Sequence, residues 1–390
     1  MSRRFVHDAH TEFDGCSILV VGGDHYNTLA AVRCLGRERI PFELLLHGEG
    51  TYGKSRIAKS KYAPSSGRIV ADSEDELLGA IEKWASTKVG DVLIAYPCSD
   101  LAERVIEECL PGSVHPKFTK GSFTALELMD KHAQAKWARE RGFYVATDGI
   151  VALDGGGEPS DIFRKFGKCI FKPVESALGA KSDIRIARTV EEIADCLRFY
   201  RSCGYKTILV QQFIEFDYEL VANGCILKSG EIIWHLIKKI QIHPKKGGSL
   251  AYGVLESDPS ICEQAYTFIQ KLADEAYCGT FDIEFFVQNG IVSLNECNFR
   301  QSGPAFSLIN RGVPFPAIWI KDAMGISYDC DSYHNLNQSD NERFAHERFL
   351  IASAVRGEER YATVMRRLFG ATQYGYWARD DIRGSLAWYR

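Results

Sequence analysis

Two strand-like runs joined by an Asn-Gly pair constrain the fold of this chain more than any other stretch. The runs are FDIEFFVQ (281–288) and IVSLNECNFR (291–300), and Asn-Gly between such runs is the strongest short-range signal for a β-hairpin. Side chains alternate between the two faces of a strand, so Glu296, Asn298 and Arg300 share one face. The sequence therefore predicts an antiparallel hairpin with an acid, an amide and a guanidinium in one row.

The length of the turn decides whether a second acid joins that row. A strict two-residue turn places Glu284 opposite Asn295, and Glu296 then faces the other way. One extra residue in the turn, as a bulge or a three-residue loop, sets Glu284 opposite Glu296. We expect this offset, because two carboxylates and the Asn298 amide oxygen are hard ligands suited to Mg²⁺, which would relieve the repulsion between the acids. The alternative is a solvated sheet face without a metal.

The first 120 or so residues alternate between buried strands and helices. Strands are expected at 17–23, 40–47 and 89–97, and helices at 28–38 and 100–110. This alternation predicts a small doubly wound α/β domain. The glycines that end the first strand lack the G-x-G-x-x-G spacing of a dinucleotide site, so a tight strand-to-helix turn is the favoured interpretation.

Beyond the helix expected at 129–143 the chain changes character. Polar, glycine-rich loops are expected at 153–161 and 245–254, and helices at 189–202, with Thr189 as N-cap, and at 261–276. The expected strands are 169–174, 183–187, 207–214, 218–227 and 231–242. This order predicts an α+β region with antiparallel sheets. After about residue 326 a polar linker and a helix-forming, aromatic tail follow.

Composition excludes some classes of partner. A length of 390 residues predicts two or three domains, and 45% hydrophobic with 25% charged residues is ordinary for a soluble globular protein. A net charge of −4 gives no general attraction to nucleic acid or an anionic membrane. The twelve cysteines are scattered, and no signal-peptide or membrane-spanning run is evident. We therefore expect reduced thiols in a cytoplasmic protein.

The hairpin and several other stretches together resemble the ATP-grasp family. The pattern of Glu284 followed by Glu296-x-Asn-x-Arg and a small glycine-containing loop is similar to the family's metal-binding signature. Three further stretches of this chain resemble elements of the family. MDKHAQAKWARERG is similar to the family's Asp-Lys helix, and CIFKPVESALGAKSDIRIA to its lid strand and phosphate loop. TILVQQFIEFDYEL is similar to its adenine hinge. The resemblance runs in the expected order from about residue 17 to 325, and the first domain is similar to the family's pre-ATP-grasp domain.

This resemblance implies an ATP-grasp fold that combines α/β and α+β parts. A doubly wound pre-ATP-grasp domain would precede a small lid subdomain and a central antiparallel-sheet subdomain. The implied boundaries are 1–125 for the pre-ATP-grasp domain, 126–210 for the lid, 211–326 for the catalytic subdomain with the metal site, and 327–390 for a C-terminal segment.

Several residues match the family's nucleotide-binding positions. Lys131 and Lys172 would hold the phosphates of ATP as compact cations, under a loop that contains Gly179. Family phosphate loops are usually richer in glycine, so Lys181 would supply a contact that backbone amides otherwise make. The matches for adenine and ribose binding are Gln211, Gln212, Phe213, Ile214 and Glu219. Each of these residues has an alternative as an ordinary surface or buried-strand side chain.

The remaining matches concern the metal and the reaction centre. The implied ligands of Mg²⁺, or of Mn²⁺ in its place, are Glu284, Glu296 and Asn298. The implied catalytic residues are Arg300, Lys238, Ser302 and Gly303. Arg300 would hold a developing acyl phosphate, and the turn after it would add amides. Lys239 remains an alternative to Lys238 for the residue facing the terminal phosphate. Loops 176–182 and 244–253 are the expected lids.

The resemblance implies an ATP-dependent ligase that activates a carboxylic acid, an amino acid being one option, and joins it to an amine. SKYAPS, YPCSD and WARDDIRGSLAWYR resemble the D-aspartate-ligase-like and carbamoyl-phosphate-synthase-like carboxylate–amine ligases. The polar candidates for substrate recognition are Arg311, Lys245, Lys246 and Ser249.

Two alternatives remain open: an ATP-grasp carboxylase or other acyl-phosphate enzyme, and a nucleotide-binding regulatory module without turnover. The partners implied are small-molecule acids and amines rather than nucleic acid or membrane. A homodimer is common in the family.

Overall fold

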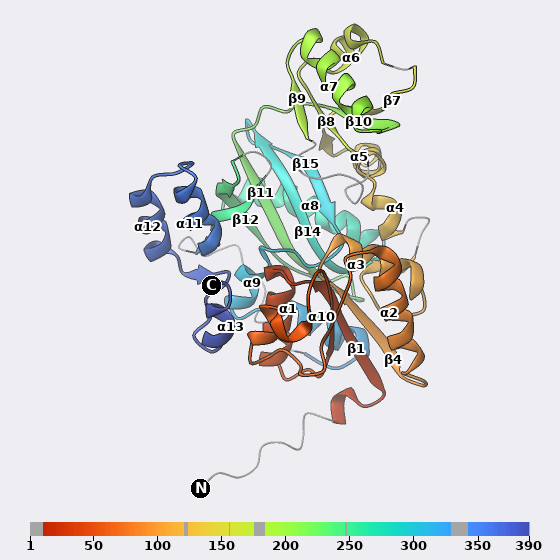
Figure 1. Cartoon of the computed structure of the whole chain (residues 1–390), viewed down its shortest axis with the longest axis vertical. Coiled ribbons are helices and arrows are strands. Elements are labelled where there is room, and N and C mark those ends of the chain that lie inside the picture. Colours follow the sequence, from red (N-terminus) through yellow and green to blue (C-terminus); the bar gives the residue numbers. More distant parts are fainter. Residues whose placement is uncertain are drawn as a thin grey trace. The chain divides into compact units, whose positions relative to one another are not determined.

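The computed structural model describes residues 11–120, 124–155, 157–174, 184–245, 248–328 and 342–389. The chain forms two compact units, whose elements are labelled in Figure 1. The first unit comprises Met1–Ser122, Val221–Asp282 and Asn298–Arg390, and the second comprises Phe123–Leu220 and Ile283–Cys297. Each unit has a hydrophobic core of its own.

A parallel sheet in the order β3-β2-β1-β4 lies in the first unit. Its strands are β1 (Cys16–Gly23), β2 (Glu43–His47), β3 (Arg68–Val70) and β4 (Val92–Pro97). Ile18 and Val20 of β1 pack into one hydrophobic cluster and Leu19 and Val21 into another, so both faces of the sheet are buried. The predicted doubly wound α/β domain is confirmed. Because β2 and β4 flank β1, the strand order reverses at the carboxyl ends of β1 and β4.

The helices of this part are α1 (Tyr26–Arg37), α2 (Glu74–Ser86) and α3 (Asp100–Cys109), with short 3₁₀ turns η1 (Thr11–Phe13), η2 (Tyr52–Lys54) and η3 (Ile57–Lys59). Serine N-caps begin two of the helices. Ser73 accepts a hydrogen bond from the Glu76 amide at the start of α2, and Ser99 accepts one from the Ala102 amide at the start of α3. Strand β3 and helix α2 were not predicted from the sequence.

A mixed sheet region completes the first unit. Its strands follow the order β17-β16-β13-β12-β11-β14, and β5 pairs with the start of β14. The strands are β5 (Lys117–Phe118), β11 (Tyr218–Ile226), β12 (Ile232–His243), β13 (Ser249–Leu255), β14 (Tyr277–Gln288), β16 (Arg343–Ala345) and β17 (Gln373–Tyr374). The helices are α8 (Pro259–Asp274), α9 (Ala305–Asn310), α10 (Phe315–Met324), α11 (Glu347–Val355), α12 (Tyr361–Gly370) and α13 (Ile382–Leu386).

Strand β13 corrects the predicted loop at 245–254. Leu250 and Ala251 are buried, and β13 pairs antiparallel with β12 and with β16. The glycines and lysines of this stretch favour a loop, but two strand partners override that local preference. The prediction of a lid at 244–253 is therefore wrong from Ser249 onward, where β13 begins. The other expected lid, at 176–182, lies outside the described residues.

The second unit contains an antiparallel sheet in the order β7-β10-β8-β9. Its strands are β7 (Asp148–Ala152), β8 (Cys169–Lys172), β9 (Arg185–Ala187) and β10 (Thr207–Gln212), and helices α6 (Pro159–Phe166) and α7 (Val190–Ser202) pack with it (Figure 1). Thr189 caps α7 as predicted, accepting from the Glu192 amide. The loop expected at 153–161 already ends at Pro159, where α6 begins.

The helix expected at 129–143 is interrupted at Asp130. That residue ends α4 (Ala125–Met129) and begins α5 (Lys131–Glu140), because its carboxylate accepts a hydrogen bond from the Ala133 amide over 2.7 Å. Lys131 is thus the first residue of α5. Strand β6 (Tyr144–Val145) follows and pairs in parallel with β15 (Ile291–Asn298).

The hairpin of β14 and β15 is closed by a strict two-residue turn. Asn289 and Gly290, with φ of 50° and 77°, form the turn, so the extra turn residue that we expected is wrong. The exposure pattern along β15 nevertheless changes phase: Leu294 and Cys297 are buried, and the two residues between them are both half-buried. The contact between Glu284 and Asn295 over 3.3 Å agrees with the pairing that a strict turn predicts.

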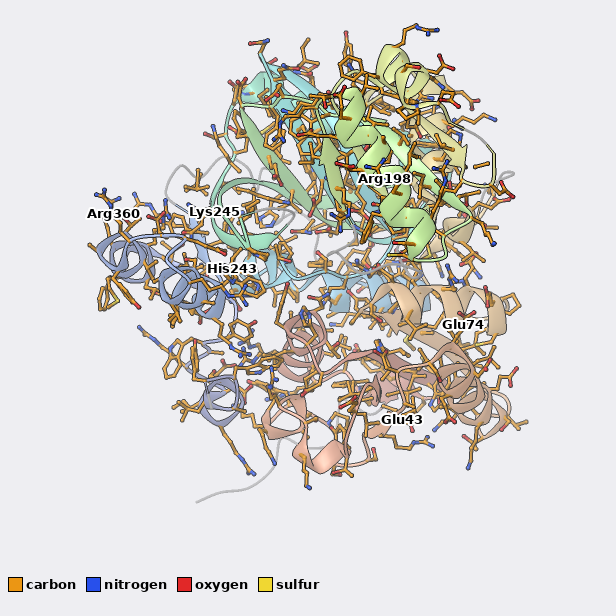
Figure 2. The ribbon with its side chains drawn as sticks, turned by 45° about the horizontal axis from the view of Figure 1, so that its top comes forward. Glu43, Glu74, Arg198, His243, Lys245 and Arg360 are labelled. Atoms are coloured by element: carbon orange, nitrogen blue, oxygen red, sulfur yellow. The ribbon has the colours of Figure 1, made fainter. Side chains whose placement is uncertain are left out.

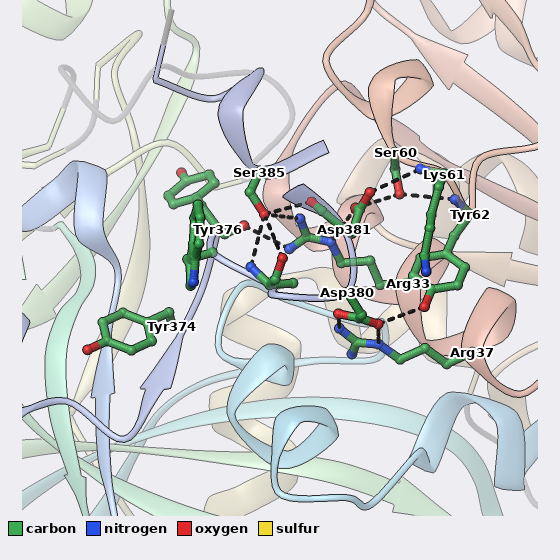
Figure 3. Close-up of polar contacts among 12 residues, drawn as sticks. Arg33, Arg37, Ser60, Lys61, Tyr62, Tyr374, Tyr376, Asp380, Asp381 and Ser385 are labelled. Atoms are coloured by element: carbon green, nitrogen blue, oxygen red, sulfur yellow. Dashed lines mark hydrogen bonds and ion pairs between the residues drawn. The ribbon is translucent and has the colours of Figure 1, made fainter. Parts of the chain in front are cut away.

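The C-terminal segment docks on the first helix of the same unit (Figure 3). Arg33 of α1 donates to Asp381 over 2.9 Å, and the Ser60 hydroxyl donates to the same carboxylate over 2.7 Å. Arg37, one turn later, donates from two nitrogens to Asp380 over 2.8 and 2.9 Å. Two adjacent aspartates therefore hold the tail, one in a buried pair and one at the surface.

Candidate nucleotide and acyl-phosphate site

The second unit brings together basic and acidic residues from distant parts of the sequence. The Nζ atom of Lys131 lies 3.6 Å from Oε1 of Glu296. Lys172 on β8 donates to Oε1 of Gln211 on β10 over 2.7 Å. The register of these strands, with Lys172 opposite Leu209, brings the side chains of Lys172 and Gln211 together. These predicted nucleotide and metal residues thus contact one another in pairs.

The electrostatic environment of Lys172 is unusual for a lysine. Burial lowers its pKa to about 8, and the neighbouring positive charge of Lys131 acts in the same direction. The carboxylates of Glu296, Asp148 and Glu284 oppose this shift. Lys172 is therefore charged at neutral pH, although it loses its proton far more readily than an exposed lysine.

Asp148 is a member of this cluster that the sequence did not reveal. Its side chain is fully buried and accepts from Arg139 over 2.6 Å, and His132 lies 2.6 Å from its other oxygen. Both partners lie on α5, which Lys131 begins. The carboxylate therefore anchors that helix from β7, a strand that follows it.

The acids of the hairpin have partners within the same unit. Glu284 accepts a hydrogen bond from the Asn295 amide over 3.3 Å, and Glu296 pairs with Lys131 as described. Both glutamates act electrostatically on Lys172, so both belong to the same charge cluster. Among the residues that the structure describes, no group of three or more His, Cys, Asp or Glu side chains is arranged to hold a metal. Two carboxylates and an amide, completed by phosphate oxygens, still match the donors that Mg²⁺ prefers.

In the first unit, Asp282 orients several of the predicted reaction-centre residues. Its carboxylate accepts from the Asn298 amide over 3.4 Å, from the Asn223 amide over 2.5 Å and from the Ser302 hydroxyl. Since the Asn298 nitrogen is turned toward Asp282, its amide oxygen accepts from Arg300 over 3.4 Å. Asp282 was not among the predicted site residues.

Arg300 is held by an acid that no sequence motif indicated. Its Nε donates to Oδ1 of Asp100, at the start of α3, over 2.6 Å. Burial alone would lower the pKa of Arg300, but the carboxylates of Asp100, Asp282 and Glu103 raise it. Arg300 therefore carries a permanent charge in a fixed orientation.

The turn after Arg300 is packed against neighbouring backbone and side chains. Gln301 accepts from the Tyr96 hydroxyl over 2.8 Å, and its own backbone N–H donates to the Pro97 carbonyl over 3.3 Å. A Cβ atom at Gly303 would lie 2.1 Å from the ring of Tyr26, so only glycine fits there. Ser302 is buried, with its hydroxyl committed to Asp282. The roles of Ser302 and Gly303 in catalysis remain predictions.

The predicted adenine and ribose residues lie along one segment. Gln211 and Gln212 end β10, whereas Phe213 and Ile214 follow it, so the strand expected at 207–214 is two residues too long. The Phe213 ring lies 3.7 Å from the Lys168 ammonium. Glu219 is half-buried near the start of β11. Their contacts with a nucleotide also remain predictions.

The other candidates are scattered. Lys238 and Lys239 are neighbours on β12, with Lys239 buried and Lys238 partly exposed, and the choice between them stays open. Lys245 is exposed beyond His243, which lies 2.7 Å from Glu358 (Figure 2). Ser249 begins β13, and Arg311 lies 3.5 Å from the His235 ring. Gly179, Lys181 and Lys246 fall outside the described residues.

None of the helices in the described part of the chain is long and apolar enough to cross a membrane.

Comparisons with known proteins identify the fold. The family model of the ATP-grasp domain matches residues 147–303. No curated protein matches the sequence. Among solved structures, N5-carboxyaminoimidazole ribonucleotide synthetase from Thermus thermophilus is similar with a TM-score of 0.60 at 16% identity, over 84% of this chain and 81% of that one.

Two further structures have the same fold. Biotin carboxylase from Campylobacter jejuni has a TM-score of 0.60 at 16% identity, over 84% of this chain and 74% of its own. L-amino acid ligase from Bacillus licheniformis has a TM-score of 0.58 at 9% identity, over 84% of this chain and 78% of its own. At such identities the likeness establishes the fold alone. Together with the family match over residues 147–303, it shows that this chain contains a domain with the ATP-grasp fold.

Proposed function

We propose that the protein is an ATP- and Mg²⁺-dependent ligase that activates a carboxylic acid as an acyl phosphate and joins it to an amine. The reaction would release ADP and phosphate. The ATP-grasp domain at 147–303 supports the use of ATP. The charged residues described in each of the two units support the proposed formation of an acyl phosphate.

The observation that carries the proposal is the charge cluster around Lys172. A half-buried lysine next to Lys131 is unfavourable on its own, because the two positive charges repel each other. The phosphates of a nucleotide would stabilise both lysines, and a divalent cation would stabilise the neighbouring carboxylates of Glu284 and Glu296. A magnesium nucleotide therefore matches both halves of the cluster.

Bound Mg²⁺ would neutralise phosphate charge in such a site. Glu284 and Glu296 would hold the ion with carboxylates, and Asn298, two residues further along β15, would contribute its amide oxygen. Lys131 and Lys172 would position the phosphates. Mn²⁺ accepts the same oxygen donors and is proposed as a substitute.

Arg300 supports the acyl-phosphate half of the proposal. Its planar guanidinium suits carboxylate and phosphate oxygens, and Asp100 fixes its orientation before any ligand binds. In the proposed step, the acid's carboxylate attacks the terminal phosphorus and Arg300 stabilises the product. Such chemistry depends on positioning and charge neutralisation more than on a strong base.

A carboxylase that activates bicarbonate is the second candidate. The observation that favours it is the fold shared with a biotin carboxylase and a carboxyaminoimidazole ribonucleotide synthetase. The L-amino acid ligase of the same fold favours an amino acid substrate instead. A regulatory module that binds ATP without turnover is the third candidate.

A substrate screen that measures ADP release separates the three. The purified protein is mixed with Mg-ATP, one acid from a panel that includes amino acids and bicarbonate, and either an amine or hydroxylamine, which traps acyl phosphates. The proposal expects acid-dependent ADP release and an amide or hydroxamate of matching mass. Release with bicarbonate alone among the acids identifies the carboxylase, and ATP binding without release for any acid identifies the regulatory module.

We also propose that the protein acts on small molecules, is located in the cytoplasm and forms a homodimer. Its domain boundaries are proposed at residues 125, 210 and 326. Limited proteolysis with and without ATP tests those boundaries, and light scattering measures the oligomeric state.

A further inference from the structure

Three side chains meet at the carboxyl edge of the parallel sheet in the first unit. His47 is the last residue of β2, Asp72 follows β3, and Ser99 follows β4. Nδ1 of His47 lies 2.7 Å from Oδ1 of Asp72, and Nε2 lies 2.7 Å from Oγ of Ser99. The carboxyl edge of an open α/β sheet, where the strand order reverses, is where such folds bind ligands.

The fold explains why His47 can reach a residue beyond β1. Strand β1 separates β2 from β4 and ends in glycine, with Gly23 paired to His47. A Cβ atom at Gly22 would lie 2.8 Å from Cβ of Cys98, the residue before Ser99. Glycine at this point lets the end of β4 approach, which brings the Ser99 hydroxyl within reach of the imidazole.

The hydrogen bonds assign the proton positions on His47. An ionised Asp72 can only accept, so Nδ1 of His47 carries the proton that it donates. In the neutral ring Nε2 is then an acceptor, and the Ser99 hydroxyl donates to it. This is the arrangement in which a histidine acts as general base toward a serine and a carboxylate orients the ring.

Capping of α3 by Ser99 is the other role of this side chain, and the two roles are compatible. The hydroxyl oxygen accepts from the Ala102 amide over 3.2 Å while its hydrogen points to His47. Ser73 caps α2 in the same way, accepting from the Glu76 amide over 3.4 Å. Capping alone therefore makes Ser73 and Ser99 equivalent, and only the contact with His47 distinguishes them.

We propose that Ser99, His47 and Asp72 form a nucleophilic site for acyl transfer to water, with carboxylic esters as the substrate class. The site is distinct from the residues assigned to ATP. Ser99 and His47 are both partly exposed, so a small substrate can reach the hydroxyl. The first turn of α3 follows Ser99 directly, and the positive end of the helix dipole favours an oxyanion at this point.

The proposed step conserves atoms and charge. Oγ of Ser99 forms a bond to the acyl carbon, its proton passes to Nε2 of His47, and the bond to the leaving alkoxide breaks as that proton is returned to it. Water then attacks the acyl-serine, gives its proton to His47, and releases the acid as Ser99 regains a hydrogen. Asp72 is a positioning residue. Its side chain is 64% exposed, so its contribution is screened by solvent.

Labelling with a fluorophosphonate, followed by peptide mass spectrometry, tests the proposal on the full chain. The reagent bonds to an activated serine and releases fluoride, so modification at Ser99 and none at Ser73 is expected. His47→Gln should slow labelling and p-nitrophenyl acetate hydrolysis by about 100-fold or more, the usual effect of losing a general base. Asp72→Asn should slow both by about tenfold or less, because that carboxylate is solvated.

Two variants separate chemistry from capping. Ser99→Asp keeps a good N-cap for α3 and should melt near the wild-type temperature while losing all labelling and ester hydrolysis. Ser73→Ala should leave labelling and ester hydrolysis unchanged. Equal labelling of Ser73 and Ser99, labelling that His47→Gln and Asp72→Asn leave unaltered, or no labelling of the wild type would each overturn the proposal.

Discussion

Nε of Arg300 donates to Oδ1 of Asp100 over 2.6 Å, which ties the segment after β15 to the first turn of α3, 200 positions earlier in the chain. The same guanidinium donates to the Asn298 oxygen, whose amide nitrogen is held by Asp282. Two acids therefore set the orientation of the pair Asn298 and Arg300. In the proposed reaction, this pair faces the metal and the acyl phosphate.

Loss of the guanidinium should affect catalysis more than nucleotide binding. Arg300→Ala is expected to lower kcat by about 100- to 1,000-fold, because it removes a preorganised donor to the developing charge. The Kd for ATP should change by about twofold or less, since this interaction forms in the transition state. Isothermal titration calorimetry and ADP-release kinetics measure the two quantities. An equal loss in both would assign Arg300 to the nucleotide instead.

Asp100→Asn provides the companion measurement, with an intermediate loss of kcat expected because Arg300 stays but is less firmly held. Asp380→Asn is a matched control, since it disrupts an Arg–Asp pair of the same unit outside the site and should leave kcat unchanged.

The metal assignment depends on Glu296. Glu296→Gln keeps the shape of the side chain but removes the charge, so Mg²⁺-dependent turnover should be abolished while the melting temperature stays near that of the wild type. Glu275→Gln, at a pair with Lys271 outside the site, serves as control. Near-normal turnover of Glu296→Gln at saturating Mg²⁺ would remove Glu296 from the metal site.

The lowered pKa of Lys172 predicts a pH dependence of ATP binding. The charged ammonium is the form that binds phosphate, and it predominates below the pKa of about 8. Affinity should therefore be constant well below that pH and fall above it, by up to about tenfold per pH unit until the pKa of the complex is reached. Equilibrium titrations across this range measure the slope. Lys172→Arg keeps its charge, so its affinity for ATP should not fall over this pH range. If the variant shows the same fall in affinity as the wild type, another group is responsible for the pH dependence.

The two adjacent aspartates of the tail allow a matched stability experiment (Figure 3). Asp381→Ala removes the carboxylate that Arg33 contacts while the guanidinium stays buried, and should lower the free energy of unfolding by about 3–5 kcal/mol. Asp380→Ala removes the more exposed pair with Arg37 and should cost about 0–1 kcal/mol. Urea denaturation measures both. Equal costs would show that the burial of Arg33 contributes nothing to the attachment of the tail.

Local patterns predicted the elements whose signals are contained within a few residues. Continuous runs of apolar residues identified β1, β2 and β4, and the N-cap at Thr189 fixed the start of α7. The same reasoning failed at β13, where Gly253 and the preceding lysines suggested a loop. That strand forms because β12 and β16 lie on either side of it, and such tertiary pairing leaves no local trace.

The hairpin shows what can and cannot be predicted from the alternation of side chains between the two faces of a strand. Arguments from this alternation indicated that a strict turn places Glu284 opposite Asn295, and these two side chains contact each other over 3.3 Å. They placed an extra residue in the turn, whereas the turn consists of Asn289 and Gly290 alone. The partners that hold the site, Asp100, Asp148 and Asp282, were missed because each is recognised only by the residue it contacts across the fold.

The most direct test of the proposed chemistry follows one oxygen atom. The acid identified by the ADP-release screen is labelled in its carboxylate with heavy oxygen, and the phosphate released during turnover is analysed by mass spectrometry. Formation of an acyl phosphate followed by attack of the amine at the acyl carbon transfers one labelled oxygen to each phosphate. That transfer is the predicted result. Phosphate that carries no label, while ADP is released, would contradict an acyl-phosphate ligase and indicate attack on ATP by another nucleophile.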